Sequence, residues 1–319
     1  MTFCRPDRQR GVAVITALLL TTLAVTIVGS LFWQQQVQVR SIENQRLQLQ
    51  KQWILRGALD WTRLILSEDK RISREVDHLG EPWAVPLAET RLDQYVEKER
   101  AGEVPDAALS GGIADANARF NLRNIYPKEA TAPNEKEVAA FAQLLTNLQL
   151  NPSLAQATAA LMASAQKKPD AGGGAPAMDA SSPRPMNIEH VDDLMAVPGF
   201  TPEILAKLRD YVIVLPEVTK VNVNTALAEV LSAKIAKLTL SNAMALVSAR
   251  QRKVITSTSD LNSGLLPPSV SVTGEEVDFG SKYFLVNGNV RLNRAGMQMQ
   301  ALMKRESNGA TSVLWIREY

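Results

Sequence analysis

Three carboxylates in the segment TGEEVDF could bind a metal ion. Glu275, Glu276 and Asp278 lie close together in a stretch rich in turn-forming residues. Carboxylate oxygens are the ligands that calcium prefers in proteins. An acidic loop that only contacts water has the same composition, and the residues alone leave both interpretations open. If a cofactor is present, the segment favours calcium.

The other residue types that carry chemistry are scarce. The chain has 319 residues but only two histidines, His78 and His190, far apart in sequence. This argues against a histidine-rich zinc site and against a Ser-His-Asp triad. Cys4 is the only cysteine, so no disulfide can form within the chain. One histidine could still serve in a site of another kind. We therefore expect a fold that depends on packing, with a metal as a possible aid.

The N-terminal region has the composition of a membrane-spanning helix. The 22 residues from Val12 to Trp33 carry no charge, and a helix of this length crosses a hydrocarbon layer of about 30 Å. Arg5, Arg8 and Arg10 precede the apolar run, opposed only by Asp7. The positive-inside rule therefore predicts a single-pass protein with a cytoplasmic N-terminus and the remainder outside the cytoplasm.

Three interpretations of this region compete: a plain signal anchor, a secretory signal cut after Ser30, and a segment cut before the apolar run, after Gly11. No proline follows until well past Leu66, so one helix could continue to that residue. A cut at Ser30 would divide this helix, which favours the other two interpretations. One helical face outside the bilayer is expected to carry Ile54, Ala58, Trp61 and Ile65.

The remainder of the chain alternates between strand and helix patterns. We expect a turn and short strands over 110–125, helices over 133–166, a flexible loop over 167–185 and two helical hairpins over 191–212 and 221–251. The last of these should begin a helix near Asn224 or Thr225. Three antiparallel strands are expected over 281–293, 295–307 and 310–319, with turns at Gly296 and at Asn308-Gly309.

The hairpins raise an alternative function, because helix-hairpin-helix modules bind DNA through a glycine-rich turn. The first turn contains Gly199 alone, and the second, KLTLS, contains no glycine. From Met186 to Ser257 eight lysines and arginines face seven acidic residues. A net charge of +2 for the whole chain adds no basic excess. We therefore expect no nucleic acid partner, with salt-sensitive DNA binding through Lys207 and Arg209 as the alternative.

The segment RQRGVAVITALLL resembles a prepilin leader, which has basic residues, a glycine and then an apolar helix. The resemblance implies that prepilin peptidase cuts after Gly11 and methylates Val12. Most pilins carry glutamate at the fifth mature position, where this chain has Thr16. That carboxylate pairs with the N-terminal ammonium of the next subunit in the filament, so Thr16 suggests a subunit with none ahead of it. The alternative is that Thr16 bonds to a helical carbonyl in a generic anchor.

Further segments extend the resemblance over the whole chain. They are IADANARFNL, LMAVPGF, VNVNTALAEVL and the ending SKYFLV…VRL. Together with the leader they resemble the protein K family, the minor pseudopilins K of bacterial type II secretion systems. The resemblance implies an α+β, pilin-like fold in which a long N-terminal helix packs on an antiparallel sheet interrupted by a large all-α insert. The insert would hold the helix-hairpin-helix-like hairpins.

The expected domains follow from this resemblance. They are a leader over 1–11, the transmembrane half of the helix over 12–33, the first part of the pilin-like domain over 34–130, the insert over 131–260 and the C-terminal strands over 261–319. The implied location is the bacterial inner membrane, with the C-terminal domain in the periplasm. A minor pilin of a type IV pilus is a close alternative.

The resemblance also implies partners and a role, and it implies that the protein is not an enzyme. The subunit would assemble with the minor pseudopilins I and J, and further with H and the major pseudopilin G. The assembly would form the tip that initiates the pseudopilus and supports export of folded proteins across the outer membrane. Family members bind calcium in the pilin-like domain, which directs attention to Glu275, Glu276 and Asp278 as ligands.

Overall fold

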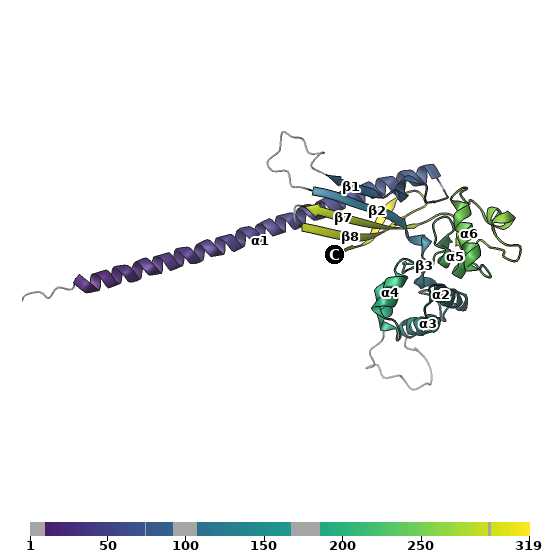
Figure 1. Cartoon of the computed structure of the whole chain (residues 1–319), viewed down its shortest axis with the longest axis horizontal. Coiled ribbons are helices and arrows are strands. Elements are labelled where there is room, and N and C mark those ends of the chain that lie inside the picture. Colours follow the sequence, from purple (N-terminus) through teal and green to yellow (C-terminus); the bar gives the residue numbers. More distant parts are fainter. Residues whose placement is uncertain (1–9, 74, 92–106, 167–185, 293–294) are drawn as a thin grey trace, which may run out of the picture.

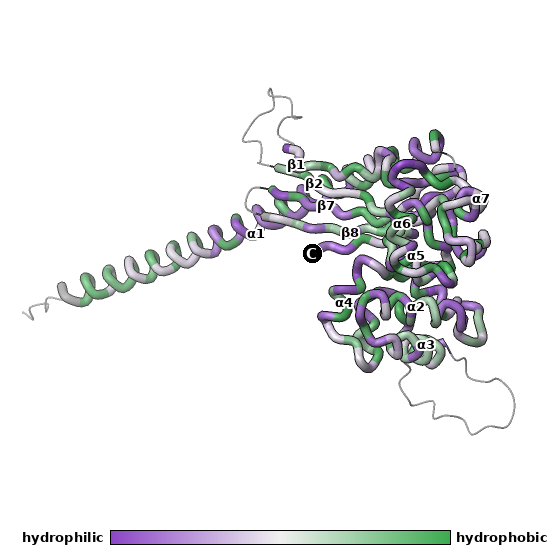
Figure 2. Tube along the Cα trace, turned by 45° about the vertical axis from the view of Figure 1, so that its right-hand side comes forward, coloured by the Kyte–Doolittle hydropathy of each residue, from purple (hydrophilic) through white to green (hydrophobic). Residues whose placement is uncertain are grey.

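The computed structural model describes residues 10–73, 75–91, 107–166, 186–292 and 295–319. Its longest element is helix α1 (Arg10–Ser73), whose first part extends away from the rest of the molecule (Figure 1). The predicted continuous helix is confirmed and reaches seven residues beyond Leu66. Among the described residues, α1 is long and apolar enough to cross a membrane, with a mean hydropathy of 2.4 over its most apolar window. Figure 2 shows this part of the helix as mainly hydrophobic.

A five-stranded antiparallel sheet packs against the second half of α1. Its order is β1-β2-β7-β8-β9, and the strands span Leu87–Arg91, Ala107–Asp115, Tyr283–Leu292, Ala295–Arg305 and Thr311–Glu318. The predicted C-terminal meander is therefore confirmed. Strands β2 and β7 are neighbours although a long stretch of chain separates them, and Asp115 pairs with Phe284 where β2 ends. The chain thus leaves the sheet and returns to it at the same place.

The helical insert occupies the stretch between β2 and β7 (Figure 1). Its α-helices are α2 (Glu135–Asn147), α3 (Ser153–Gln166), α4 (Pro202–Leu208), α5 (Ala228–Lys234), α6 (Leu240–Arg250) and α7 (Thr258–Asp260). Two short parallel strand pairs join β3 (Phe120–Asn121) to β4 (Val212–Ile213), and β5 (Val221–Asn222) to β6 (Val277–Asp278). Within its described residues the insert also has the helical turns η4 (Ala116–Ala118), η5 (Leu122–Asn124), η6 (Val191–Ala196) and η7 (Leu261–Leu265). Another turn, η1 (Pro82–Ala84), lies between α1 and β1. The loop predicted over 167–185 lies outside the described residues.

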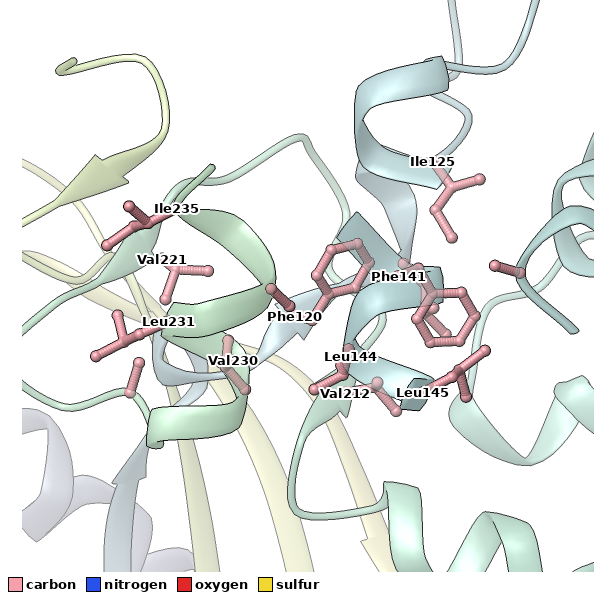
Figure 3. Packing of buried hydrophobic residues seen from close by; sticks show 14 of the residues in the cluster. Phe120, Ile125, Phe141, Leu144, Leu145, Val212, Val221, Val230, Leu231 and Ile235 are labelled. Atoms are coloured by element: carbon pink, nitrogen blue, oxygen red, sulfur yellow. The ribbon is translucent and has the colours of Figure 1, made fainter. Parts of the chain in front are cut away.

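The insert has its own hydrophobic core. Phe120 stacks on Phe141 with ring centroids 5.5 Å apart, and Figure 3 shows side chains from α2, α5 and the short strands converging around them. A second core fills the space between α1 and the sheet, where Leu55, Leu59 and Leu66 of α1 are buried. The two cores are built from different segments. A third, smaller cluster joins them, since Ile213 and Leu215 of the insert pack with Tyr283, Leu285 and Leu302 of the sheet.

The face of α1 that meets the sheet is rotated from the predicted one. Ile54, Ala58 and Ile65 pack at the margin of the core beneath α1, but Trp61 is half exposed. The buried centre of the helix is the row Leu55, Leu59, Leu66. The prediction for Trp61 was wrong because its apolar spacing also fits a second, exposed row.

Several predicted boundaries also need correction. Gly111 and Gly112 lie inside strand β2 and not in a turn, and Gly296 lies inside β8, paired with Arg291. Gly309 does form a turn, with a φ of +85°. The helix predicted to start near Asn224 or Thr225 begins at Ala228, and residues 191–196 form a 3-10 helix. Gly111 has a physical reason to lie inside a strand, because a neighbouring backbone approaches it closely.

Gly111 and Gly112 provide a matched test of that explanation. A Cβ at Gly111 would lie 2.3 Å from the carbonyl oxygen of Asn287 on β7, whereas a Cβ at Gly112 would make ordinary contact with Pro86 at 3.8 Å. Gly111→Ala should lower the free energy of unfolding by roughly 1–3 kcal/mol. Gly112→Ala should be neutral or slightly stabilising. Urea unfolding of the detergent-solubilised chain measures both, and equal effects would contradict the assigned register.

Candidate functional site

The candidate site is the joint where the sheet meets the helical insert. Asparagine side chains there form hydrogen bonds to irregular backbone. They come from the segment IADANARFNL, from Asn124 just after it, and from the segment VNVNTALAEVL. The Asn121 side chain donates to the Glu217 carbonyl at 2.8 Å and accepts from the Leu215 amide at 3.0 Å. Asn124 makes the same pair of bonds with the backbone of Thr219. Each amide replaces a missing stretch of strand pairing, because it can donate and accept simultaneously.

Asp115 accepts hydrogen bonds at the centre of the joint. Its Oδ2 accepts from the Thr225 hydroxyl at 2.5 Å, from the Ser281 hydroxyl at 2.5 Å and from the Asn222 amide at 3.1 Å. Its Oδ1 accepts from the Asn117 backbone amide at 2.7 Å. These partners come from both ends of the insert, so one carboxylate at the end of β2 holds together the chain segments that leave and re-enter the sheet.

Arg305, at the end of β8, forms the second half of the joint. Its Nη1 donates to Asp69 Oδ2 at 2.8 Å, and its Nη2 donates to Asp77 Oδ1 and to the Ser281 carbonyl at 3.0 Å. The guanidinium also stacks over Phe284, 4.6 Å from the ring centroid. Arg305 and both carboxylates are buried. A buried ion pair holds only when its charges are paired and hydrogen bonded, which this geometry provides.

The joint contains more negative charge than Arg305 alone can balance. Burial, reinforced by the charge of Glu81, raises the pKa of Asp69 from 3.8 to about 6. Burial also raises the pKa of Asp115 from 3.8 to about 6, against the opposing effect of hydroxyl donors. Because folding raises both pKa values, their stabilising contribution is complete below 3.8 and is lost as the pH rises through about 6. A proton or a cation would relieve this excess charge.

A buried acidic triad within the joint could hold a metal. Oxygens of Asp69, Asp77 and Glu81 lie within 4.8 Å of one another. Glu81 Oε2 accepts from the Trp83 indole at 2.7 Å and the His78 backbone amide at 2.9 Å, while its buried Oε1 has no hydrogen-bond partner. That free oxygen suits a cation ligand. Against it, Arg305 already occupies one oxygen of each aspartate and would repel a second positive charge.

The predicted calcium ligands lie elsewhere. Glu275 is exposed and Glu276 is partly exposed just before strand β6, and Asp278 is exposed within that strand. Glu276 accepts from the Thr273 amide at 3.4 Å and Asp278 from the Phe279 amide at 2.9 Å. Among the described acidic residues, the closely spaced group is the buried triad, so calcium binding by Glu275, Glu276 and Asp278 stays a prediction.

Sequence reasoning missed the triad because its members and Arg305 are far apart along the chain. Arg305 and Asp77 are separated by 228 residues. One local signal existed in the segment HLGEPWAVP, where Glu81 precedes Trp83 and follows His78. A carboxylate flanked by aromatic residues and proline is unusual for a solvated loop, which marks Glu81 as a candidate for burial.

The predicted processing residues lie at the start of α1. The helix includes Gly11 and Val12, and the apolar side chains that follow are exposed. The Thr16 hydroxyl donates to the carbonyls of Val12 at 3.1 Å and Ala13 at 3.0 Å. This satisfies the hydroxyl within its own helix, as the generic-anchor alternative requires. It is equally the geometry of a subunit that needs no partner at this position, so the role of Thr16 stays a prediction.

The first helical hairpin has a capped helix and a tight turn that packs against a neighbouring helix. Thr201 caps α4 by accepting from the Ile204 amide at 3.4 Å, with Pro202 in the first turn. Gly199 has a φ of +101°, and a Cβ there would lie 2.9 Å from Leu154. Arg209 donates to Asp192 at 3.0 Å. The turn therefore packs against α3, and one of the two basic residues of the DNA-binding alternative is paired with a carboxylate.

Comparison with protein families places most of the insert in one group. Residues 118–217 and 221–279 match two models, both described as type II secretion system protein K. Among curated proteins, the chain is 29% identical to the type II secretion system protein K of Pseudomonas aeruginosa, over 96% of this chain and 92% of that protein. It is 28% identical to that of Pectobacterium carotovorum, over 93% of each.

A solved structure shares the fold. It is the GspK–GspI–GspJ complex of the enterotoxigenic Escherichia coli type 2 secretion system, with a TM-score of 0.62 at 19% identity. The match covers 88% of this chain and 99% of that one. It supports an α+β architecture with a long N-terminal helix on an antiparallel sheet and a helical insert, as the sequence predicted.

Arg305→Met tests the joint. The substitution leaves Asp69 and Asp77 buried without their cation, so the free energy of unfolding should fall by roughly 3–5 kcal/mol. Arg71→Met is the matched control, because Arg71 pairs with Glu68 on the exposed side of α1, where loss of a pair has little effect. Chemical unfolding at neutral pH compares the variants. If Arg305→Met is as stable as the control, the ion pairs do not hold the joint.

Proposed function

The chain belongs to the type II secretion system protein K family, and from this we propose that it works at the tip of the pseudopilus. It is a minor pseudopilin, a structural component of the secretion system and not an enzyme. The observation that carries the proposal is the similarity to the Pseudomonas aeruginosa protein over 96% of this chain, which includes the N-terminal helix as well as the insert. This favours a secretion component over the DNA-binding and type IV pilin alternatives.

The bulk of the insert supports the tip position. The insert lies between two adjacent strands of the sheet and carries its own core. In a thin filament, subunits stack through their long helices. A domain as wide as this insert would clash with a further subunit placed above it. We infer a pilin-like domain whose sheet is interrupted between β2 and β7 by a mainly helical insert. This insert contains the region 131–260, together with short strand pairs, and caps the assembly.

The N-terminal region supports a membrane-inserted precursor. We propose that residues 1–11 are a leader, that prepilin peptidase cuts between Gly11 and Val12, and that Val12 is methylated. Residues 12–33 then span the inner membrane once, with the folded domain in the periplasm. The uncharged run and the preceding arginines support this orientation. Thr16 in place of glutamate supports a subunit at the end of the filament, with no other subunit ahead of it.

The proposed partners are the minor pseudopilins I and J, with H and the major pseudopilin G below them. The Escherichia coli complex, by its description, contains GspK with GspI and GspJ. We propose that this chain forms the corresponding tip complex, which initiates the pseudopilus and supports the export of folded proteins across the outer membrane.

Calcium is the proposed cation of the protein. The buried triad offers one free oxygen on Glu81 and an excess of negative charge, although Arg305 competes for the same carboxylates. The exposed carboxylates of Glu275, Glu276 and Asp278 are the alternative ligands. Calcium takes about 6–8 oxygens, so either set needs water or carbonyl oxygens as well.

Replacing Gly11 tests the processing step and, with it, the function. Gly11→Leu should block leader removal, so mass spectrometry of the membrane-purified chain should find the N-terminus at Met1 in place of a methylated Val12. Secretion should fail in cells that carry only this variant. Gly29→Leu is the control, because this glycine lies within the same apolar run and, among the described residues beyond its own helical turn, none lies within 4 Å of a Cβ there. An unsubstituted chain that keeps Met1 would contradict the pseudopilin assignment.

A calcium titration separates the two acidic sites. Calcium at a hundredfold excess over its Kd should stabilise the folded chain by about 2.7 kcal/mol, and a chelator should reverse this. If the triad binds it, Glu81→Gln removes the thermal shift and Glu276→Gln keeps it. The opposite pattern assigns calcium to the loop. The absence of a shift in the unsubstituted chain would contradict calcium binding altogether.

A further inference from the structure

The face of the sheet turned away from α1 carries a group of amide side chains. Leu285 and Leu302 on this face pack with the insert, whereas Phe284 and Val286 point the other way, into the core beneath α1. Because side chains alternate along a strand, Asn287 lies on the same face as Leu285. Beyond the apolar contact with the insert, the face therefore continues with polar residues.

Cross-strand pairing gathers these polar residues into two neighbouring rows. Directly opposite residues of an antiparallel pair lie on the same face of the sheet. One row is Asn289, Gln298 and Tyr319, and the other is Asn287, Gln300 and Arg317. The backbones of Gln298 and Tyr319 exchange two hydrogen bonds, which continues the first row past the end of β9. We refer to these six residues as the amide platform.

The amide platform is open to solvent and borders a shallow hollow of about 320 Å³. Asn287, Asn289 and Gln298 are exposed, and Tyr319 is 70% exposed. Gln300 donates to Asn287 Oδ1 at 3.0 Å, which holds these two amides in position. Among the described residues, none forms a hydrogen bond with the side chains of Asn289 and Gln298. These two amides are therefore free for a ligand.

The side chains of the amide platform suit a sugar. A carboxamide both donates and accepts hydrogen bonds and carries no charge. The hydroxyl and acetamido groups of an amino sugar have the same dual character, so four amides side by side can pair with several of them. Tyr319 adds an exposed aromatic ring with a polar tip. The apolar C–H face of a sugar ring can pack against this ring.

Arg317 adds one positive charge to an otherwise neutral surface. Its guanidinium lies over the Trp315 ring, 5.1 Å from the ring centroid. In the described part of the chain, no carboxylate forms an ion pair with it. The planar guanidinium pairs well with carboxylates. The charge of the amide platform therefore favours a mainly neutral polymer that carries acidic groups at intervals.

We propose that the amide platform binds the glycan of the bacterial cell wall, a polymer of N-acetylated amino sugars with carboxylate-bearing side groups. The proposal rests on the proposed function for the periplasmic location of the folded domain, where this polymer lies. The amides bind hydroxyl and acetamido groups, Tyr319 packs against a sugar ring and Arg317 pairs with a carboxylate. Because the hollow is shallow, each sugar unit binds weakly, and several repeats together retain the chain.

A protein partner fits the amide platform less well than a glycan does. The centre of a protein interface is typically apolar, whereas the centre here consists of four neutral amides. The large apolar side chains on the same face, Leu285 and Leu302, already pack with the insert. Nucleic acid fits no better, because a single arginine balances few phosphates.

Co-sedimentation with purified cell-wall sacculi tests the proposal. The full-length chain in detergent is mixed with increasing amounts of sacculi, and the bound fraction gives an apparent Kd. Asn289→Ala/Gln298→Ala should bind about tenfold more weakly, because the double variant loses the hydrogen bonds of two amides. Gln156→Ala/Gln251→Ala is the matched control, since both amides are exposed but lie in the insert. It should bind as the unsubstituted chain does.

A second variant separates the charged part of the ligand from the neutral part. Arg317→Gln should weaken binding to sacculi several-fold and leave binding to chitin, a neutral polymer of N-acetylglucosamine, unchanged. Arg252→Gln, which replaces an exposed arginine of the insert, should change neither. Soluble glycan fragments from digested sacculi should release the bound chain. Lipopolysaccharide, the other acidic glycan of the cell envelope, should not release it.

The outcomes distinguish this inference from the proposed function. A chain that captures the I and J pseudopilins but does not sediment with sacculi would overturn the inference alone. Equal sedimentation of the Asn289→Ala/Gln298→Ala variant and its control would do the same, as would release by lipopolysaccharide. If that variant loses capture of I or J, the amide platform is a protein interface and the glycan assignment is wrong. A chain that sediments through the amide platform but captures neither pseudopilin would support the inference and contradict the proposed function.

Discussion

The contact between Arg305 and Asp77 is the constraint on which the architecture depends. Arg305 ends β8, and Asp77 follows α1 and also receives the Ser281 amide at its second oxygen. The Asp77 backbone bonds to the insert as well, since its carbonyl accepts from the Asn222 side chain at 3.0 Å. One residue therefore ties helix, sheet and insert together. A buried apolar cluster, in which Ile213 and Leu215 of the insert meet Tyr283, Leu285 and Leu302 of the sheet, supports the same arrangement.

The joint is polar because irregular backbone must be satisfied where a large insert leaves a sheet. Regular pairing stops at Asp115, and hydrophobic side chains cannot replace the lost hydrogen bonds. Asn224 illustrates the solution, because its side chain donates to the carbonyl of Ile255 at 2.8 Å and accepts from the Ile255 amide at 3.0 Å. The asparagines of VNVN therefore stabilise the joint as strand neighbours would.

The sequence predicted what is local and missed what is distant. The α1 helix and the C-terminal strands follow from spacing rules, which act within a few residues. The joint does not, since it pairs side chains more than a hundred residues apart, such as Asp115 and Thr225. Trp61 was misplaced for a related reason. Its spacing fits two faces of the helix, and only the position of the sheet decides which face is buried.

The position of the joint explains how one subunit can be both wide and able to join a filament. The end of α1, the end of β2, the start of β7 and the end of β8 all meet there, so the insert departs from the end of the sheet farthest from the membrane segment (Figure 1). The side of α1 nearer the membrane is left clear of the insert. Width at the far end would block stacking above, while the clear helical side leaves room for lateral packing, and these two properties are the ones that the proposed capping position requires.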